Sequence, residues 1–136
     1  MQPSAILESA LYVSDLDAAE TFYGEVMGLE RIAKVDGRHV FFRCGQGVLL
    51  LFNADATRQP PKPDARLPVP PHGTTGQGHL CFAGTAAEIE DWKTRLEGAG
   101  IAIEADFEWP SGGRSIYFRD PSGNSLEIAE PRIWGI

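Results

Sequence analysis

The sequence predicts an α+β protein built from two β-α-β-β-β modules that follow each other along the chain. Two observations lead to this prediction. A strand, a helix and three further strands recur in the same order in both halves, and such repetition marks a repeated structural unit. A proline-rich segment between the halves holds six of the ten prolines. We therefore expect modules at residues 1–54 and 77–136, the second with a C-terminal tail, joined by a connecting loop at 55–76.

The first module is predicted to start with a strand over residues 6–13, where apolar and polar residues alternate. Ser14 and Asp17 form an S-x-x-D arrangement that is typical of a helix N-terminus. The helix should end at Gly28, because glycine tolerates a left-handed cap. An Asp-Gly and a Gly-Gln-Gly sequence then separate three apolar segments and favour hairpins between them. These segments predict strands over residues 29–35, 39–44 and 48–53.

The second module repeats this order, beginning with a strand over residues 79–83. Thr85 and Glu88 have the spacing of a capped helix start, and the helix should end around residues 98–100, where glycines gather. An Asp-Pro-Ser-Gly turn then joins the last two of three predicted strands. Those strands lie near residues 101–107, 114–119 and 124–129.

Composition and charge exclude several kinds of partner. The net charge of -7 and the pI near 4.9 argue against binding to nucleic acid or to anionic membranes. No apolar run approaches the roughly 20 residues of a membrane span, and no signal peptide opens the chain. Cys44 and Cys81 lie inside apolar strands, where we expect reduced core thiols rather than a disulfide. We therefore expect a cytoplasmic protein.

Three potential metal ligands, Glu8, His79 and Glu127, each lie on a predicted strand. Because side chains alternate between the two faces of a strand, each ligand should point to the face opposite the large apolar residues of its strand. Two carboxylates and one imidazole suit a hard or borderline divalent cation with coordination positions left open. An open site of this kind favours an enzyme over a structural metal. The alternative is three unrelated polar residues on exposed faces.

Three features of the sequence together resemble the vicinal oxygen chelate superfamily, the group of glyoxalase I, fosfomycin-resistance enzymes, extradiol dioxygenases, methylmalonyl-CoA epimerase and bleomycin-binding proteins. They are the paired modules, Val-Ser-Asp-Leu at 13–16 with Phe-Tyr at 22–23, and Asp-Pro-Ser-Gly-Asn-Ser-Leu-Glu at 120–127. The resemblance implies mixed sheets that curl around a central cavity holding a divalent metal, often with modules from two subunits at each site. The ligand positions of the family fall at Glu8, His79 and Glu127.

The resemblance also implies a set of substrate-contacting residues. Fosfomycin-resistance enzymes match locally at Gly-Arg-Ser-Ile-Tyr-Phe, residues 113–118, a strand that lines their substrate pocket. Tyr117 would then supply a catalytic hydroxyl near the metal, as a donor or weak acid, with Ser115 on the same face. Arg114 could clamp an anionic substrate, Trp109 could stack on a flat ligand at the cavity rim, and His72 could reach the cavity from the connecting loop. The alternatives are a half-buried tyrosine, a surface arginine and a solvated loop histidine.

At two ligand positions the sequence differs from enzymes of this superfamily, and these differences limit the reactions that it could catalyse. Glyoxalase I uses a fourth carboxylate on the last strand of the first module, where this chain reads Val-Leu-Leu-Leu-Phe at 48–52. Extradiol dioxygenases hold Fe(II) with two histidines and one carboxylate, whereas the first position here is Glu8. A second carboxylate makes the site harder and more anionic, which disfavours oxygen chemistry.

The expected function is therefore a divalent-metal-dependent, glyoxalase-like enzyme with one Mn, Fe(II), Ni, Zn or Mg ion per site. It should bind a small oxygen-rich substrate at the metal and stabilise an oxyanion or enolate in a lyase, isomerase or transferase-like reaction. An extradiol-type dioxygenase is one alternative, and a metal-free, bleomycin-type binding and sequestration protein is another. We also expect a homodimer, because a second copy can cover the exposed strand edges of each half-barrel.

Overall fold

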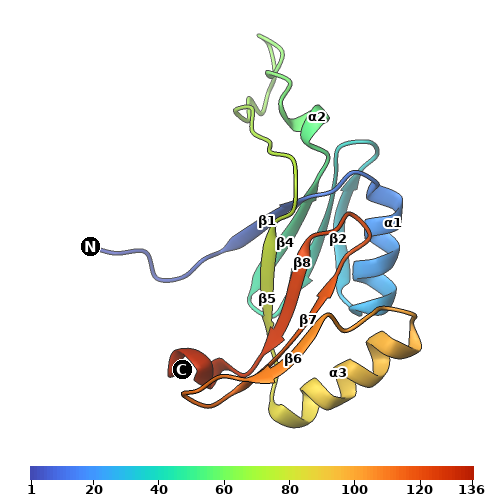
Figure 1. Ribbon diagram of the computed structural model, residues 1–136. Helices are drawn as coiled ribbons and strands as arrows, with labels where there is room; N and C mark the ends of the chain where they lie inside the picture. Colours follow the sequence, from blue (N-terminus) through green and yellow to red (C-terminus); the bar gives the residue numbers. More distant parts are fainter. The chain divides into compact units, whose positions relative to one another are not determined.

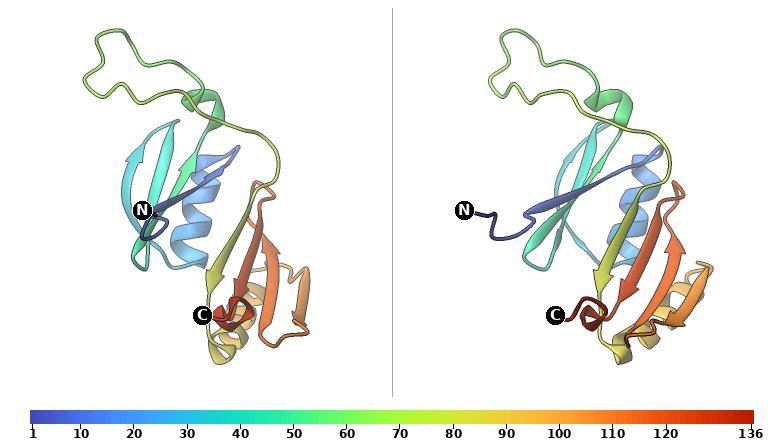
Figure 2. Two further views of the ribbon diagram at one scale, coloured as in Figure 1. Left: turned by 90° about the vertical axis from the view of Figure 1, so that its left-hand side faces the viewer. Right: turned by 60° about the vertical axis from the view of Figure 1, so that its left-hand side comes forward.

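The computed structural model describes residues 1–136, which fold into two compact units, Met1–Gly76 and Gln77–Ile136. Each unit holds one four-stranded mixed sheet with a helix against one face (Figures 1 and 2). The predicted order of a strand, a helix and three strands occurs in both units, so the predicted fold class is confirmed. The proline-rich segment is part of the first unit. None of the helices combines the length and the apolar character needed to cross a membrane.

The sheet of the first unit has the strand order β1-β4-β3-β2, with β1 parallel to β4 and the other neighbours antiparallel. Helix α1 covers one face of this sheet (Figure 1). Its Ala19 is buried, as are Phe22, Tyr23 and Phe42, and the ring of Tyr23 contacts the rings of the other two. The elements of this unit are β1 (Glu8–Tyr12), α1 (Leu16–Thr21), the π-helical η1 (Phe22–Val26), β2 (Glu30–Val35), β3 (His39–Cys44), β4 (Gly47–Phe52) and the short helix α2 (Ala54–Thr57).

Both main helices begin at polar caps, one of which differs from the prediction by a residue. Asp15, not Ser14, caps α1, because its carboxylate accepts a hydrogen bond from the backbone N–H of Ala18 at 3.0 Å. Thr85 caps α3 (Ala86–Gly98) as predicted, and with Glu88 it forms a reciprocal capping box. These caps satisfy backbone N–H groups that a helix start otherwise leaves without partners.

The sheet of the second unit has the corresponding order β5-β8-β7-β6, with β5 parallel to β8. Helix α3 covers one face (Figure 2) and buries Ile89 and Leu96 completely. The sheet residues that face this core alternate along β7 and β8, as strand geometry requires: Ile116, Phe118, Leu126 and Ile128. The remaining elements are β5 (His79–Ala83), β6 (Ala105–Glu108), β7 (Arg114–Arg119), β8 (Ser125–Ala129) and the 3-10 helix η2 (Pro131–Trp134).

The register of the second sheet decides which side chains share its other face. Cys81 lies opposite Glu127 in the β5–β8 pair, and Glu127 lies opposite Tyr117 in the β7–β8 pair. Because directly paired residues project to the same side, these three residues form one row across the sheet. His79, two residues before Cys81, projects to that side too. We call the side away from α3 the polar face of the second sheet.

The cysteines are free thiols, but their predicted place in the core is wrong for Cys81. This residue is exposed on the polar face, and Cys44 is half-buried in β3. The apolar composition of β5 suggested burial, whereas the alternation of the strand sends only Leu80 and Phe82 toward α3.

Candidate active site

The second unit brings two of the three predicted ligands together on neighbouring parallel strands. The Nε2 atom of His79 on β5 lies 3.3 Å from Oε2 of Glu127 on β8. The Glu127 side chain is buried, with only 7% of its surface exposed. Its second oxygen, Oε1, is buried without a hydrogen-bond partner. Tyr117 and Cys81 also interact with this carboxylate, and its unpartnered oxygen can accept a further donor or a cation.

The second nitrogen of the imidazole fixes how His79 faces Glu127. Nδ1 lies 3.0 Å from the backbone carbonyl oxygen of Ser125, and this oxygen can only accept a hydrogen bond. Nδ1 must therefore carry a proton, which leaves the lone pair of Nε2 pointing toward the carboxylate in the neutral ring. Two acceptors then face each other, and they attract only when the ring is protonated or when a cation lies between them. A backbone partner on the outer nitrogen is also what orients most metal-binding histidines.

The spacing of this pair suits two ligands of one ion. Ligand distances of about 2.1 Å place two donors roughly 3.0 to 3.4 Å apart at octahedral or tetrahedral angles. The observed separation of 3.3 Å lies within that range. The pair supplies one imidazole nitrogen and one carboxylate, donors that fit a divalent cation. A buried, unpartnered Oε1 adds a further acceptor on the same carboxylate.

The third predicted ligand, Glu8, opens β1 in the first unit, where its side chain is exposed. No group of three or more His, Cys, Asp or Glu side chains is arranged to hold a metal ion. Strand β4, which pairs with β1, carries only glycine and apolar residues, so the first unit offers no second carboxylate beside Glu8 on that strand. The structure therefore assembles the His79–Glu127 pair, and Glu8 stays a prediction.

Tyr117 adjoins the pair and is held as a neutral donor. Its ring stacks on the ring of His79, with 6.2 Å between the centroids and an interplanar angle of 19°. Removal from water, followed by its interaction with Glu127, raises the pKa of Tyr117 to about 12. Neighbouring atoms that shield the sulfur from water, followed by the charge of the same carboxylate, raise the pKa of the Cys81 thiol to about 12, although the residue as a whole is exposed. Both groups therefore keep their protons at neutral pH.

Ser115 and Trp109, two predicted substrate-contacting residues, bind each other. The indole Nε1 of Trp109 donates a hydrogen bond to Oγ of Ser115 at 2.8 Å. Ser115 is fully buried, whereas 37% of the Trp109 surface is exposed. Ser115 lies on β7 two residues before Tyr117, hence on the polar face. The hydrogen bond fixes the indole ring beside that face.

Arg114 is placed away from these residues, in an ion-pair network. Its guanidinium donates to both carboxylate oxygens of Asp106 at 2.8 Å and to Glu90 of α3 at 2.6 Å. Asp106 also accepts from Lys93 of the same helix. These hydrogen bonds, that of Arg114 first, hold the pKa of Asp106 well below its usual range. Arg114 therefore links β7 to β6 and α3, and the structure does not place it with Tyr117.

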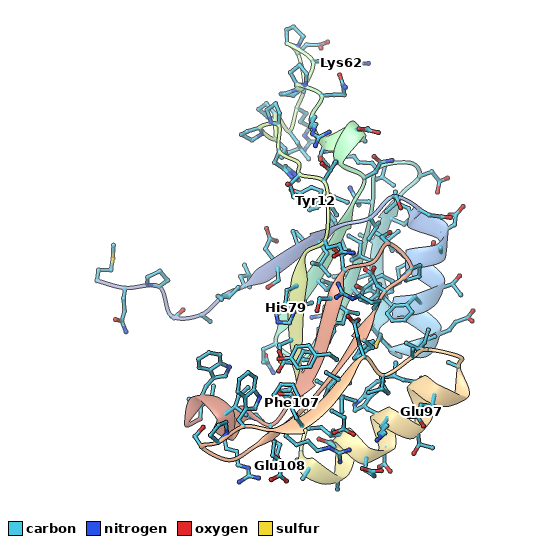
Figure 3. All side chains as sticks on the ribbon, in the orientation of Figure 1. Tyr12, Lys62, His79, Glu97, Phe107 and Glu108 are labelled. Atoms are coloured by element: carbon cyan, nitrogen blue, oxygen red, sulfur yellow. The ribbon has the colours of Figure 1, made fainter.

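The two histidines of the first unit belong to an aromatic cluster on its own sheet. His72 lies with Nδ1 2.6 Å from the Tyr12 hydroxyl and packs its ring edge-on against Phe52. His39 stacks on Phe41 with 4.0 Å between ring centroids, and its Nδ1 is buried without a partner. Burial, followed by the charge of Arg38, lowers the pKa of His39. Figure 3 shows Tyr12 in this unit and His79 in the second.

One aromatic residue of the polar face was missed by the sequence analysis. Phe107 on β6 stacks on Tyr117 with 5.7 Å between centroids and an interplanar angle of 11°. It also meets Trp109 edge-on at 5.0 Å. The signal was present in the sequence, because Phe107 and Trp109 are two residues apart in a predicted strand and its continuation. The pairing of Phe107 with Ser115 could not be read from the sequence.

Comparisons with known proteins agree with this architecture. Residues 5–128 match the family model described as the Glyoxalase/Bleomycin resistance protein/Dioxygenase superfamily. A solved structure of a lactoylglutathione lyase from Agrobacterium tumefaciens is 49% identical, with a TM-score of 0.92 and full coverage of both chains. The glutathione transferase FosA of Serratia marcescens is 33% identical over 87% of this chain and 74% of its own. A virulence protein of Salmonella typhimurium is 31% identical over 88% of this chain and 79% of its own.

Proposed function

Because the chain belongs to the Glyoxalase/Bleomycin resistance protein/Dioxygenase superfamily, we propose that it is a divalent-metal-dependent, glyoxalase-like enzyme. The observation that carries the proposal is the His79–Glu127 pair, in which Nε2 and Oε2 lie 3.3 Å apart beside a buried carboxylate oxygen without a partner. A single cation could bind both side chains. Glu8 completes the proposed ligand set, from the same chain or from a second copy.

The residues around the pair fit a small substrate rich in oxygen. A bound ion would act as a Lewis acid toward an oxyanion or enolate that develops on the substrate. Tyr117, whose raised pKa keeps its hydroxyl protonated, donates a hydrogen bond to a substrate oxygen next to Glu127. The Ser125 carbonyl keeps the His79 ring oriented throughout. Ser115 holds Trp109 at the edge of the same face.

The relatives suggest the class of reaction to try first. Both the lactoylglutathione lyase and the glutathione transferase act, by their names, on glutathione compounds. We therefore propose a lyase or transferase-like reaction of a glutathione-linked or similarly oxygen-rich compound. The absence of a carboxylate on β4 separates this chain from the four-ligand pattern expected of glyoxalase I. An extradiol-type dioxygenase and a bleomycin-type binding protein stay as the alternatives.

A homodimer is part of the proposal. Strands β1 and β5 each lie at one edge of their sheets, with unpaired backbone groups along one side. Such edges are usually covered, and a second copy can cover them in a symmetric assembly. The oligomeric state is measurable by sedimentation or light scattering.

The test is an activity screen of the purified protein loaded in turn with Mn, Fe(II), Ni, Zn and Mg. Lactoylglutathione formation from glutathione and methylglyoxal, glutathione conjugation and catechol ring cleavage report on the three enzyme classes. We expect turnover in one of the first two assays, lost in Glu127→Ala and in the presence of a chelator. Ring cleavage with Fe(II) alone would favour the dioxygenase. Tight binding of bleomycin with no metal dependence would favour the sequestration protein.

A further inference from the structure

The polar face of the second sheet carries a continuous row of aromatic rings that starts at the proposed metal ligands. His79 stacks on Tyr117, Tyr117 stacks on Phe107, and Phe107 meets Trp109 edge-on. Successive ring centroids are 6.2, 5.7 and 5.0 Å apart. Figure 3 shows His79 and Phe107 on the side of the sheet that faces away from α3. We call Phe107 and Trp109 the aromatic platform.

The platform is exposed although its residues are large and apolar. Phe107 exposes 40% of its surface and Trp109 exposes 37%, whereas the rings facing α3, such as Phe118, are fully buried. Its geometry is nonetheless fixed in advance. The indole N–H is already bound to buried Ser115, and Phe107 lies nearly parallel to Tyr117. A fixed ring loses little conformational entropy when a ligand stacks on it.

The chemistry of the platform defines what it can receive. Because the Trp109 N–H is already bound to Ser115, the platform offers ring faces and edges rather than hydrogen bonds. The two arginines of β7 are also committed, Arg114 to Asp106 and Glu90, and Arg119 to Glu104. No arginine of this strand is thus left to hold an anionic group beyond the metal. A neutral, planar, apolar group fits the platform, because aromatic rings favour stacked or edge-on partners.

We propose that Phe107 and Trp109 form a specificity subsite for an aryl group of the substrate, attached next to the oxygens that bind the metal. This inference rests on the proposed function, because it needs the oxygen-bearing end of the substrate at His79 and Glu127. The substrate class is then an aryl-substituted compound with two adjacent oxygens, such as an aromatic α-hydroxy or α-oxo acid or its thiol adduct. Phe107 and Trp109 select this substituent, and Tyr117 lies between it and the reacting oxygens.

Two probe ligands isolate the subsite. Lactate and mandelate present the same pair of oxygens, a hydroxyl beside a carboxylate, and differ by a methyl or a phenyl substituent. Their binding is measured by calorimetry with the Mn-loaded protein and with the metal-free protein. We expect mandelate to bind about tenfold more tightly than lactate with Mn, the ratio that one stacked ring contributes. In Phe107→Ala the ratio should approach one while the affinity for lactate stays within about twofold.

Trp92→Ala is the matched control, because Trp92 is a half-buried aromatic residue on α3, at the other face of the sheet. This variant should keep the preference for mandelate. Equal binding of both probes to the Mn-loaded wild type, or a preference that survives in Phe107→Ala, would overturn the subsite and leave the metal site standing. Equal affinity for mandelate with and without Mn, with the preference lost in Phe107→Ala, would support the subsite and contradict binding of the probe through the metal. Binding of neither probe by the Mn-loaded protein would overturn the subsite, whereas the metal content of the same sample tests the metal site.

Discussion

The Nε2 atom of His79 faces the Glu127 carboxylate at 3.3 Å with its lone pair, because the proton of the ring is held on Nδ1 by the Ser125 carbonyl. The same carboxylate keeps its other oxygen buried and unpartnered. With a neutral ring the two acceptors do not stabilise each other, whereas a cation between the two side chains would stabilise both. Predictions about Glu127, Tyr117 and Arg114 follow from this chemistry and its surroundings.

Glu127→Gln should stabilise the metal-free protein. The amide has the shape of the carboxylate but no charge, and its N–H can donate to Nε2 of His79. We expect the free energy of unfolding to rise by about 1 kcal/mol in the presence of a chelator, because a donor then faces the Nε2 lone pair of His79 in place of a second acceptor. Thermal or denaturant unfolding measures the change, and metal binding should be lost in the same variant.

Glu130→Gln is the control for this substitution. Glu130 is also buried, but its carboxylate accepts hydrogen bonds from Arg132 and from the backbone N–H of Arg114. Removing its charge should lower stability, the opposite sign. If metal-free Glu127→Gln unfolds more easily than the wild type, the claim that His79 and Glu127 are poorly matched without a cation is contradicted.

Tyr117→Phe should slow turnover without changing the metal content. The hydroxyl is a neutral donor that interacts with Glu127, and removing a hydrogen bond to a developing oxyanion costs roughly ten- to a hundredfold in kcat. Because the pKa of Tyr117 is raised to about 12, the wild-type rate should not fall through loss of this proton at any pH well below 12. Elemental analysis of both proteins checks the metal content, and steady-state kinetics checks the turnover rate. An unchanged kcat would show that the Tyr117 hydroxyl takes no part in the reaction.

Arg114→Ala should lower stability and leave metal binding unchanged. The guanidinium joins β7 to Asp106 and Glu90, and these partly exposed ion pairs contribute about 1 kcal/mol. The pKa of Asp106 is lowered in the folded protein, so its contribution is present above the ordinary carboxyl pKa of about 4 and fades as the pH falls below it. The stability difference between variant and wild type should therefore shrink in acid. Unchanged stability with weaker substrate binding would contradict this account and support the prediction that Arg114 clamps an anionic substrate.

The parts of the fold that follow from local chemistry could be predicted from the sequence. The Thr85–Glu88 capping box and the bounds of β3, β5 and β7 agree with the predictions, because each depends on a cap, a turn or a regular alternation. The face shared by His79 and Glu127 followed from the same alternation. Asp15 displaced Ser14 as the cap of α1 because adjacent polar residues compete for one position, and the sequence does not rank them.

The parts of the site that depend on pairing between strands could not be predicted from the sequence. The register that brings Phe107 opposite Ser115, and the hydrogen bond that joins Trp109 to Ser115, arise only when β6 and β7 meet. The commitment of Arg114 to Asp106 arises in the same way, since the two residues lie on different strands. Side-chain type alone predicted a clamp for Arg114, and its ion pairs with the neighbouring acids are visible only in the structure.

Metal content tests the central claim most directly. Purified wild type and His79→Ala are loaded in turn with Mn, Fe(II), Ni, Zn and Mg, dialysed and analysed for bound metal, with folding checked by circular dichroism. The pair of His79 and Glu127 predicts close to one tightly held ion per wild-type chain for at least one metal, and none in the variant. Equal metal in both proteins, or no metal in the wild type under any condition, would contradict it.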